Sequence, residues 1–423
     1  MRGKRRRLWE GAKSLLILLL TCSAVYLASR VLFSRQAQTL FAATEPDAAV
    51  PSTSFSDLTI RPAAFAVTWD EGRYGVLYHQ EDQEGYTQVS ALLAEALSAA
   101  DTPLHSSRSG WLKALTDPGV FCEYPGPMPL DSLARWLSGQ ERSALAGFQA
   151  KQLCVTADVL YFRDQSDGLW ACALNADLSG ALEDLFDLCS PNGARFAMED
   201  ASYRPLRSDT LTLPGTPSLP QLAVQDPVTP GTDAQPSETL RQLLQTLSFH
   251  PQTNPLYDIT GGWAITDSGE TLRIGIAGQL TYRRSDNSQI RFEATDPVDA
   301  TRALAEKTVG ALGGSARLTL RQVRTEGGAT VVRYGYAYRG AAILIHGEDW
   351  CAQFTVENGA ITAFTLKPRN YTVLEEQSVL LLPQEQAAAA LPGSVEQSLE
   401  LFYDDNGAAQ SLSPFWAVRE KEA

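Results

Sequence analysis

The chain has 423 residues, a formal net charge of −14 and an apolar fraction of 44%, with 8 tryptophans, 14 tyrosines and 15 phenylalanines. This composition supplies enough apolar and aromatic side chains for folded cores, and it excludes a largely disordered chain. The acidic balance opposes binding to nucleic acid, because phosphates repel a negatively charged surface.

The first feature along the chain is an apolar run over residues 14–33, in which Arg30 is the one charged residue. A helix of this length spans about 30 Å, the thickness of the hydrocarbon core of a bilayer. Residues 1–13 form a tail with six basic side chains, which are expected to stay in the cytoplasm. The rest of the chain holds 29 basic and 48 acidic residues, a net charge of −19. We therefore predict a single-pass protein of the cell membrane whose bulk is extracytoplasmic.

Two other interpretations of the apolar run stay open. A secretory signal peptide would be cleaved near residues 36–38 or 41–43, although the run is long for such a signal. A lipoprotein signal would end at Cys22, but the apolar residues continue beyond it. An uncleaved anchor fits the length and the flanking charges best.

One face of the predicted membrane helix carries small residues. Thr21, Ala24 and Ala28 have the spacing i, i+3 and i+7, and the two alanines form a small-xxx-small pair. Such a pair lets two membrane helices approach closely, so this face is a candidate partner-binding surface. Apolar segments also contain such pairs by chance, and a plain lipid-facing surface is the alternative.

Residues 34–62 lack sustained periodicity and are expected to form a stalk. Residues 63–205 mix β-type runs with amphipathic helical patterns, which predicts a first extracytoplasmic α+β domain. We expect strands over residues 63–69, 74–79, 120–124, 154–162 and 169–174, and helices over 89–100, 130–137 and 178–189. The prolines at 125, 127 and 129 are expected to end the third strand.

Residues 206–236 are expected to be an extended connector, because six prolines lie between Pro214 and Pro236 and exclude a helix. Residues 237–423 are predicted to form a second α+β domain. Its helices are expected near residues 237–247, 299–312 and 383–391, and strands fill most of the rest. A helix followed by antiparallel strands occurs at 299–367 and again at 383–418, which indicates a weak internal repeat. The predicted fold class is thus α+β: a transmembrane helix followed by two extracytoplasmic domains with antiparallel sheets.

The polar residues show no spacing typical of an enzyme or of a cofactor or metal site. None of the four histidines lies in a metal-binding motif. The segment 346–349 contains His346 and two acids, but it stands between two strands, where a polar turn is favoured over a metal site. The pair Asp404 and Asp405 precedes an Asn-Gly dipeptide and is expected to be part of a solvated hairpin turn. We predict no enzymatic activity, cofactor or metal.

Five cysteines follow the predicted membrane helix, and none has metal-type spacing. They are Cys122, Cys154, Cys172, Cys189 and Cys351. Three of them fall in apolar strand or helix patterns, so buried free thiols are expected, with one or two disulfides left open.

The order of a basic tail, one membrane helix and two α+β regions resembles the YycH and YycI regulatory proteins of Gram-positive bacteria. The stretches that carry the resemblance are residues 122–130 with Trp136, 248–254, 275–282 and 412–418, the last of which resembles the final strand of PepSY-like modules. The resemblance implies an extracytoplasmic regulator in a two-component system. It would contact a membrane sensor histidine kinase that controls cell-wall metabolism, with a paralogous regulator as a further candidate partner. The alternative is an anchored envelope protein that binds a ligand or peptide, or that inhibits a protease.

Overall fold

The computed structural model describes residues 60–69, 73–78, 83–212, 215, 218–228, 236–285, 289–391, 397–407 and 410–418. The chain divides into two compact units, residues 1–52 and 53–423, and the described fold belongs to the second. The predicted cytoplasmic tail, membrane helix and stalk up to residue 59 lie outside the described residues. Within those ranges, no helix combines the length and apolarity needed to cross a membrane.

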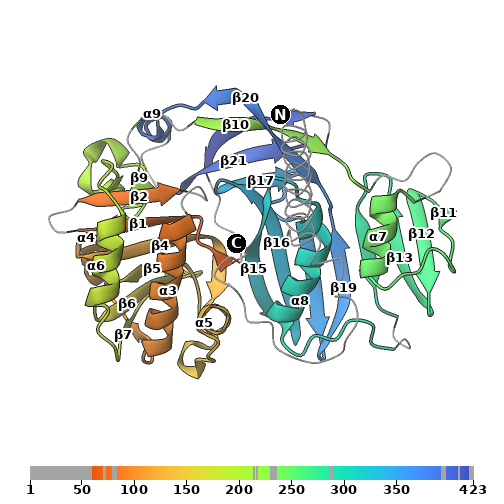
Figure 1. Cartoon of the computed structure of the whole chain (residues 1–423), viewed down its shortest axis with the longest axis horizontal. Helices are drawn as coiled ribbons and strands as arrows, with labels where there is room; N and C mark the ends of the chain where they lie inside the picture. Colours follow the sequence, from red (N-terminus) through yellow and green to blue (C-terminus); the bar gives the residue numbers. More distant parts are fainter. Residues whose placement is uncertain are drawn as a thin grey trace, which may run out of the picture. The chain divides into compact units, whose positions relative to one another are not determined.

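The N-terminal half, residues 60–212, is built on a seven-stranded antiparallel sheet with the order β2-β1-β4-β5-β6-β7-β3 (Figure 1). Its strands are β1 (Ala64–Thr68), β2 (Tyr74–Tyr78), β3 (Leu104–His105), β4 (Gly119–Pro129), β5 (Gln149–Val155), β6 (Val159–Asp164) and β7 (Leu169–Ala173). Helices α3 (Gln83–Ala99), α5 (Leu130–Ser138) and α6 (Ser179–Leu188) pack on one face, and α4 (Arg108–Thr116) packs on the other. The side chains alternate between these faces: Leu153 lies in the core with α3, and Cys154 lies in the core with α4.

The C-terminal half, residues 218–418, contains a large sheet with the order β11-β12-β13-β14-β19-β18-β16-β17-β21-β23, in which β15 also pairs with β16. Its strands are β11 (Tyr257–Ile259), β12 (Gly262–Asp267), β13 (Glu270–Gly275), β14 (Leu280–Arg283), β15 (Arg317–Glu326), β16 (Ala329–Tyr338), β17 (Ala341–Ile345), β18 (Ala352–Glu357), β19 (Ala360–Leu366), β21 (Leu399–Asp405) and β23 (Pro414–Val418). The pairing is antiparallel except between β17 and β21, which run parallel. Helix α7 (Glu238–Thr246) and helix α8 (Pro297–Ala305), which continues as a π-helical turn over Glu306–Gly310, contribute buried side chains to the core of this half.

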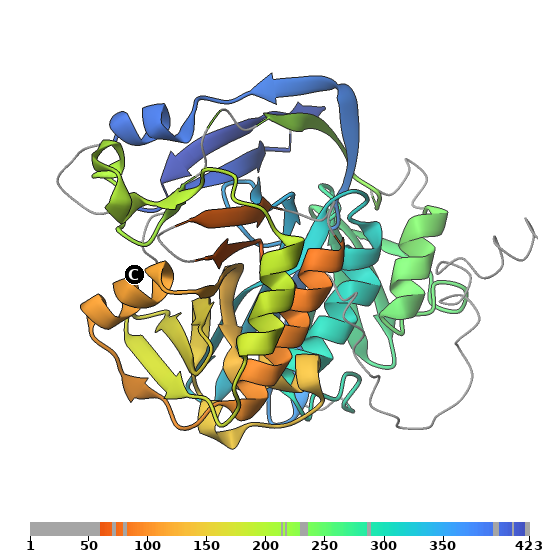
Figure 2. The ribbon, with the colours of Figure 1, turned by 60° about the vertical axis from the view of Figure 1, so that its left-hand side comes forward.

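Two smaller sheets complete the fold. Strand β10 (Ser218–Gln225) lies between β20 (Asn370–Leu380) and β22 (Ser411–Leu412), and β8 (Arg195–Phe196) pairs with β9 (Leu211–Thr212). Helix α9 (Gln384–Ala389) follows β20. Figure 2 shows α6, α3, α8 and α7 in one row, so helices of both halves line the same side of the described fold.

The two halves are joined along β4 and β15. An added Cβ on Gly126 of β4 would lie 2.5 Å from the carbonyl oxygen of Arg321 in β15, so only glycine permits this approach. The Arg321 guanidinium donates to the carbonyls of Pro125 and Tyr336 at 3.1 and 3.0 Å, and thereby ties β15 to both neighbours. One hydrophobic core runs through both halves and contains Leu133 as well as Val332.

The predicted α+β class with mainly antiparallel sheets is confirmed, as are the helices at 89–100, 130–137 and 178–189. Strand β4 continues to Pro129, so the expected end near residue 124 is wrong. A register shift between Glu123 and Met128 accommodates the prolines within the strand. The run 154–162 is divided between β5 and β6 rather than forming one strand.

The predicted connector over 206–236 is not a plain linker. Strand β10 occupies residues 218–225 and pairs with β20 and β22, which come from far later in the chain. Pro220 is accommodated in β10 by a register shift next to it. Leu219 and Leu222 of this strand enter the common core, and residues 53–423 form one compact unit by their contacts.

Candidate ligand-binding cleft

A cleft of about 950 Å³ opens where the two halves meet. Its floor is the face of the N-terminal sheet that carries α4, and β17 and β21 of the C-terminal half stand opposite. Residues of β1, β4, β5 and β6 line one side, and residues of β10, β15, β17 and β21 line the other. A volume of this size is in the upper range of ligand pockets and exceeds what a single small ion requires.

The floor of the cleft carries a polar row across three neighbouring strands. Glu123 of β4 stands opposite Gln152 of β5, and Gln152 stands opposite Arg163 of β6. Residues directly opposite in adjacent strands point to the same face, so these three side chains share the cleft side of the sheet. The register shift beside Lys151 leaves it without an opposite residue in either neighbouring strand.

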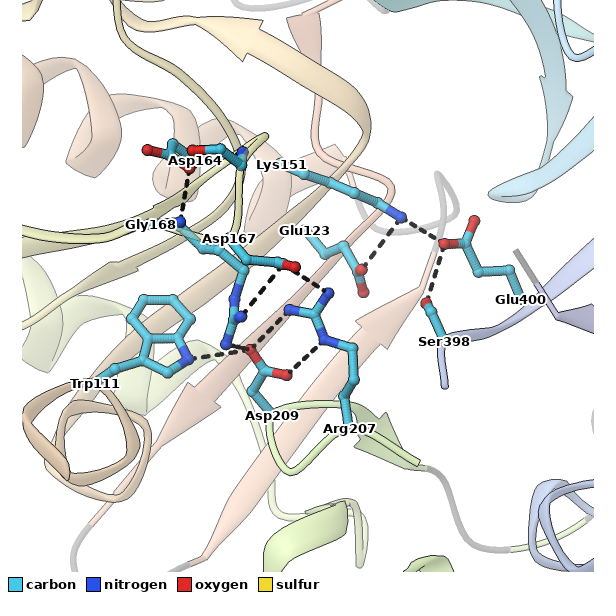
Figure 3. A network of polar contacts seen from close by, with 12 residues as sticks. Trp111, Glu123, Lys151, Asp164, Asp167, Gly168, Arg207, Asp209, Ser398 and Glu400 are labelled. Atoms are coloured by element: carbon cyan, nitrogen blue, oxygen red, sulfur yellow. Dashed lines mark hydrogen bonds and ion pairs between the residues drawn. The ribbon is translucent and has the colours of Figure 1, made fainter. Parts of the chain in front are cut away.

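Asp209 is the centre of a buried ionic cluster at one end of this row (Figure 3). Its carboxylate accepts from Trp111 Nε1 at 3.1 Å, from an Arg163 Nη at 2.5 Å and from Arg207 Nε at 3.3 Å. Asp167 contacts the same two guanidinium groups at 3.5 and 3.3 Å. Burial opposes the charge of Arg207, but Asp209 and Asp167 outweigh it and raise the pKa of the guanidinium. The cluster therefore fixes both arginines and connects the floor strand β6 to α4 and the segment before β9.

Lys151 links the two halves across the cleft. Its ammonium lies 3.7 Å from a carboxylate oxygen of Glu123 in the N-terminal half and 2.5 Å from Glu400 in β21 (Figure 3). Ser398 donates a further hydrogen bond to Glu400 at 3.3 Å. Burial raises the pKa of Glu123, and the positive charge of Lys151 opposes this shift. A single cation thus balances one carboxylate from each side of the cleft.

The C-terminal wall adds an arginine-rich rim, which we define as Arg321, Arg324 and Arg339. Arg321 is held by backbone carbonyls, as described above. Arg324 pairs with Glu326 at 2.5 Å, but both side chains are 60% exposed, so water weakens this ion pair. The Arg339 guanidinium lies 5.6 Å from the centre of the Tyr338 ring.

The lining of the cleft also includes apolar residues. They include Leu211, Leu219, Leu399, Leu401 and Trp416. Trp416 is held in place by a hydrogen bond from its indole nitrogen to the carbonyl of Leu382 at 2.9 Å. The cleft is therefore lined by both charged and apolar residues.

Thr21, Ala24 and Ala28 lie outside the described residues, so the predicted partner-binding face is not placed. Segment 346–349 forms a turn, with the backbone amide of His346 donating to the Asp405 carbonyl. Within the described residues no group of histidines, cysteines and acids has metal-site geometry. The five described cysteines are all buried and are not joined to one another by disulfides, as expected from their apolar surroundings.

The expectation that Asp405 is solvated is wrong. This residue is fully buried, and its carboxylate accepts from Arg369 Nε at 3.2 Å and from the Tyr371 hydroxyl at 2.9 Å. Arg369 and Tyr371 follow the end of β19, more than thirty positions earlier, so the pairing was not visible in the acidic dipeptide.

Sequence reasoning also missed the cleft residues. The segment from Arg163 to Gly168 was interpreted as a hairpin turn only, which it is, yet it also supplies Arg163 and Asp167 to the cleft. Asp209 lay inside the predicted connector. The arginine and aspartate at 207 and 209 gave no local signal, because charged residues are common in linkers and the partner of Asp209, Arg163, comes from a distant strand.

No protein-family model, curated protein or solved structure matches this chain.

Proposed function

We propose that the protein is a membrane-anchored extracytoplasmic regulator that binds a ligand in the cleft and modulates a sensor histidine kinase by protein–protein contact. The observation that carries the binding part is the cleft itself, which has about 950 Å³ and is lined by both halves. Ligand sites are typically concave, with apolar walls and a few fixed polar groups, and this cleft has both.

The link across the cleft supports a regulatory role for binding. Lys151 contacts Glu123 on one side and Glu400 on the other, so a ligand that displaces either contact changes how the halves hold together. A ligand shifts a protein between two states only if it binds one of them more tightly than the other. A ligand that displaces a Lys151 contact would bind more tightly to the state in which that contact is broken.

The kinase part of the proposal rests on the resemblance to the YycH and YycI proteins and on the predicted membrane helix. Lipid provides no hydrophobic drive for helix association, so close packing at small residues supplies the contact. Replacing Ala24 and Ala28 with leucine keeps the run apolar but adds bulk to the predicted face.

The test compares co-purification of a sensor histidine kinase from membranes in mild detergent for wild type and the double variant Ala24→Leu/Ala28→Leu. We expect normal abundance and topology of the variant, with capture reduced several-fold. If the double variant captures as much kinase as the wild type does, this face of the membrane helix is not the contact with the kinase. Undiminished capture by an ectodomain that lacks residues 1–35 places recognition outside the membrane.

The second candidate is an anchored envelope protein that binds a ligand or peptide, or inhibits a protease, without a kinase partner. The cleft favours it as well, because a concave site does not itself imply a signalling partner. The two candidates separate in the same experiment: a protein that binds ligand in the cleft but captures no kinase belongs to the second.

A further inference from the structure

We propose that the edge of β23 is a docking site for a short, extended and uncharged segment of a partner protein, which adds to the large sheet as a further strand. The site is a groove that β23 forms with residues 379–382 and α9, and it does not depend on the proposed function. Three features carry the inference: a strand edge left open, an apolar groove along it, and the size and charge of the exposed patch.

Strand β23 is the last strand of the large sheet and pairs with β21 on one side only. Within the described residues no strand covers its other edge, so the backbone N–H and C=O groups there can pair with an incoming strand. Pro414 blunts only the first of its five positions. Edge strands are commonly protected by charged side chains, and β23 carries none.

Other strands at the ends of the two large sheets are blunted. On β2, the Asn192 side chain donates to the carbonyl of Val76 at 2.7 Å and accepts from its amide at 3.3 Å. Strands β3 and β11 are only two and three residues long. Of the four strands that end these sheets, β23 is therefore the one that combines length with an uncovered edge in the described structure.

An apolar groove of about 470 Å³ follows this edge. All five residues of β23 line it. Because successive side chains of a strand point to opposite faces of the sheet, a groove that touches all five runs along the strand edge. Every described residue that lines the groove is apolar, and Trp416 ties β23 to the opposite wall by donating to the carbonyl of Leu382 at 2.9 Å.

The groove also gathers exposed apolar side chains. Eight large apolar side chains are exposed in the described structure, and four of them line this groove. They are Leu380, Leu382, Phe415 and Val418, which are between 36 and 79% exposed. An exposed apolar patch marks an interaction site, and a segment docked along β23 removes these side chains from water.

Size and charge favour a short partner segment over a second copy of this chain. The exposed parts of the four side chains amount to roughly two whole side chains, on the order of 300–400 Å². A stable dimer buries about 800 Å² on each partner, which is more than this patch offers. Two copies would also bring together net charges of −14, whereas an uncharged segment meets no such repulsion. The five residues of β23 span about 17 Å, which suits one short strand.

The test measures binding of a short fluorescein-labelled peptide that alternates valine and threonine to the full-length protein in mild detergent, by fluorescence anisotropy, with empty micelles as the blank. Valine and threonine favour an extended backbone. One comparison peptide replaces valine with serine, and another keeps the side chains but has N-methylated backbone amides, which cannot donate. We expect saturable binding that salt barely changes, and binding at least about tenfold weaker for each comparison peptide.

A pair of variants locates the binding. Leu380→Lys/Leu382→Lys places two charges in the groove at exposed positions, and we expect at least about tenfold weaker binding. Leu104→Lys/Ile276→Lys makes the same change at side chains that are 70% and 69% exposed outside the groove, and it should leave affinity within about twofold. Near-ultraviolet circular dichroism checks that each variant retains its fold.

Hydrogen exchange reports the strand addition itself. Bound peptide should slow amide exchange in β23 several-fold and leave exchange in β13, near the other end of the sheet, unchanged. Equal binding of the N-methylated peptide, or no slowing in β23, overturns the strand addition. Full binding by Leu380→Lys/Leu382→Lys, or no binding to the wild type, overturns the site. A wild-type dimer that this variant dissociates, measured by light scattering, overturns the choice of occupant, because a second copy then fills the groove.

Discussion

Asp209 offers the sharpest test of the described cleft. It is 2% exposed and accepts hydrogen bonds from Trp111, Arg163 and Arg207. Asp209→Asn keeps the shape of the side chain but removes its charge, so two largely buried guanidinium groups lose their main counter-charge.

The size of the effect follows from these contacts. Removing one partner of a buried ion pair typically costs about 3–5 kcal/mol, because the other charge is left uncompensated. Asp167 remains 3.5 and 3.3 Å from the two guanidinium groups, and the asparagine oxygen still accepts one hydrogen bond. We therefore expect the lower end, a loss of about 3 kcal/mol in the free energy of unfolding.

The measurement is urea-induced unfolding followed by tryptophan fluorescence. Asp184→Asn on the exposed surface of α6 removes the same charge and should change the free energy of unfolding by less than about 0.5 kcal/mol. Adding Arg163→Met to Asp209→Asn should recover part of the loss, since the cost comes from an uncompensated cation. The reasoning is refuted if Asp209→Asn costs no more than the surface control.

Three further predictions concern other parts of the fold. Asp405→Asn removes the buried counter-charge of Arg369, but Asp226 stays 3.6 Å from the guanidinium, so the change should cost about 3 kcal/mol in the same urea assay; a loss below about 1 kcal/mol would contradict the described pairing. Burial opposes ionisation of Asp164, but hydrogen bonds from Trp170, Ser166 and Gly168 outweigh it and lower its pKa below the usual 3.8. The carboxylate therefore stabilises the fold above that pH and loses this contribution as pH falls through the lowered value, so Asp164→Asn should flatten the acid side of the stability profile; an unchanged slope would refute this. Lys151→Met removes the ionic contact to Glu400 and should speed amide exchange in β21 several-fold, whereas exchange in β13, far from the contact, should not change.

Local patterns were sufficient for most individual elements. The apolar spacing in Val89, Leu92, Leu93, Ala96 and Leu97 predicts α3, and all five are buried against the first sheet. The hairpin of β6 and β7 follows from two apolar runs around a polar Asp-rich turn. These features depend on residues close together in the chain, whose periodicity survives in the sequence itself.

The sequence predicted the ends of strands and the position of the connector less well. Prolines were interpreted as breaks at residues 125–129 and as a linker at 214–236, yet β4 and β10 include prolines where the register shifts. A proline removes one backbone donor and restricts one torsion angle, but whether a strand continues depends on the partner strand beside it. That partner is β20 for β10, more than a hundred residues away.

The sequence alone determined the α+β class, the apolar character of the cysteine surroundings and the acidic balance of the chain, because these follow from composition and short-range pattern. Only the tertiary structure decided the cleft. Lys151 meets Glu400 across 249 positions, and Asp209 meets Trp111 across 98, so neither pair leaves a local pattern in the sequence. Long-range pairing of single polar residues is fixed by strand register and by the docking of the two halves, and this is why the cleft and its ion pairs could not be read from local sequence patterns.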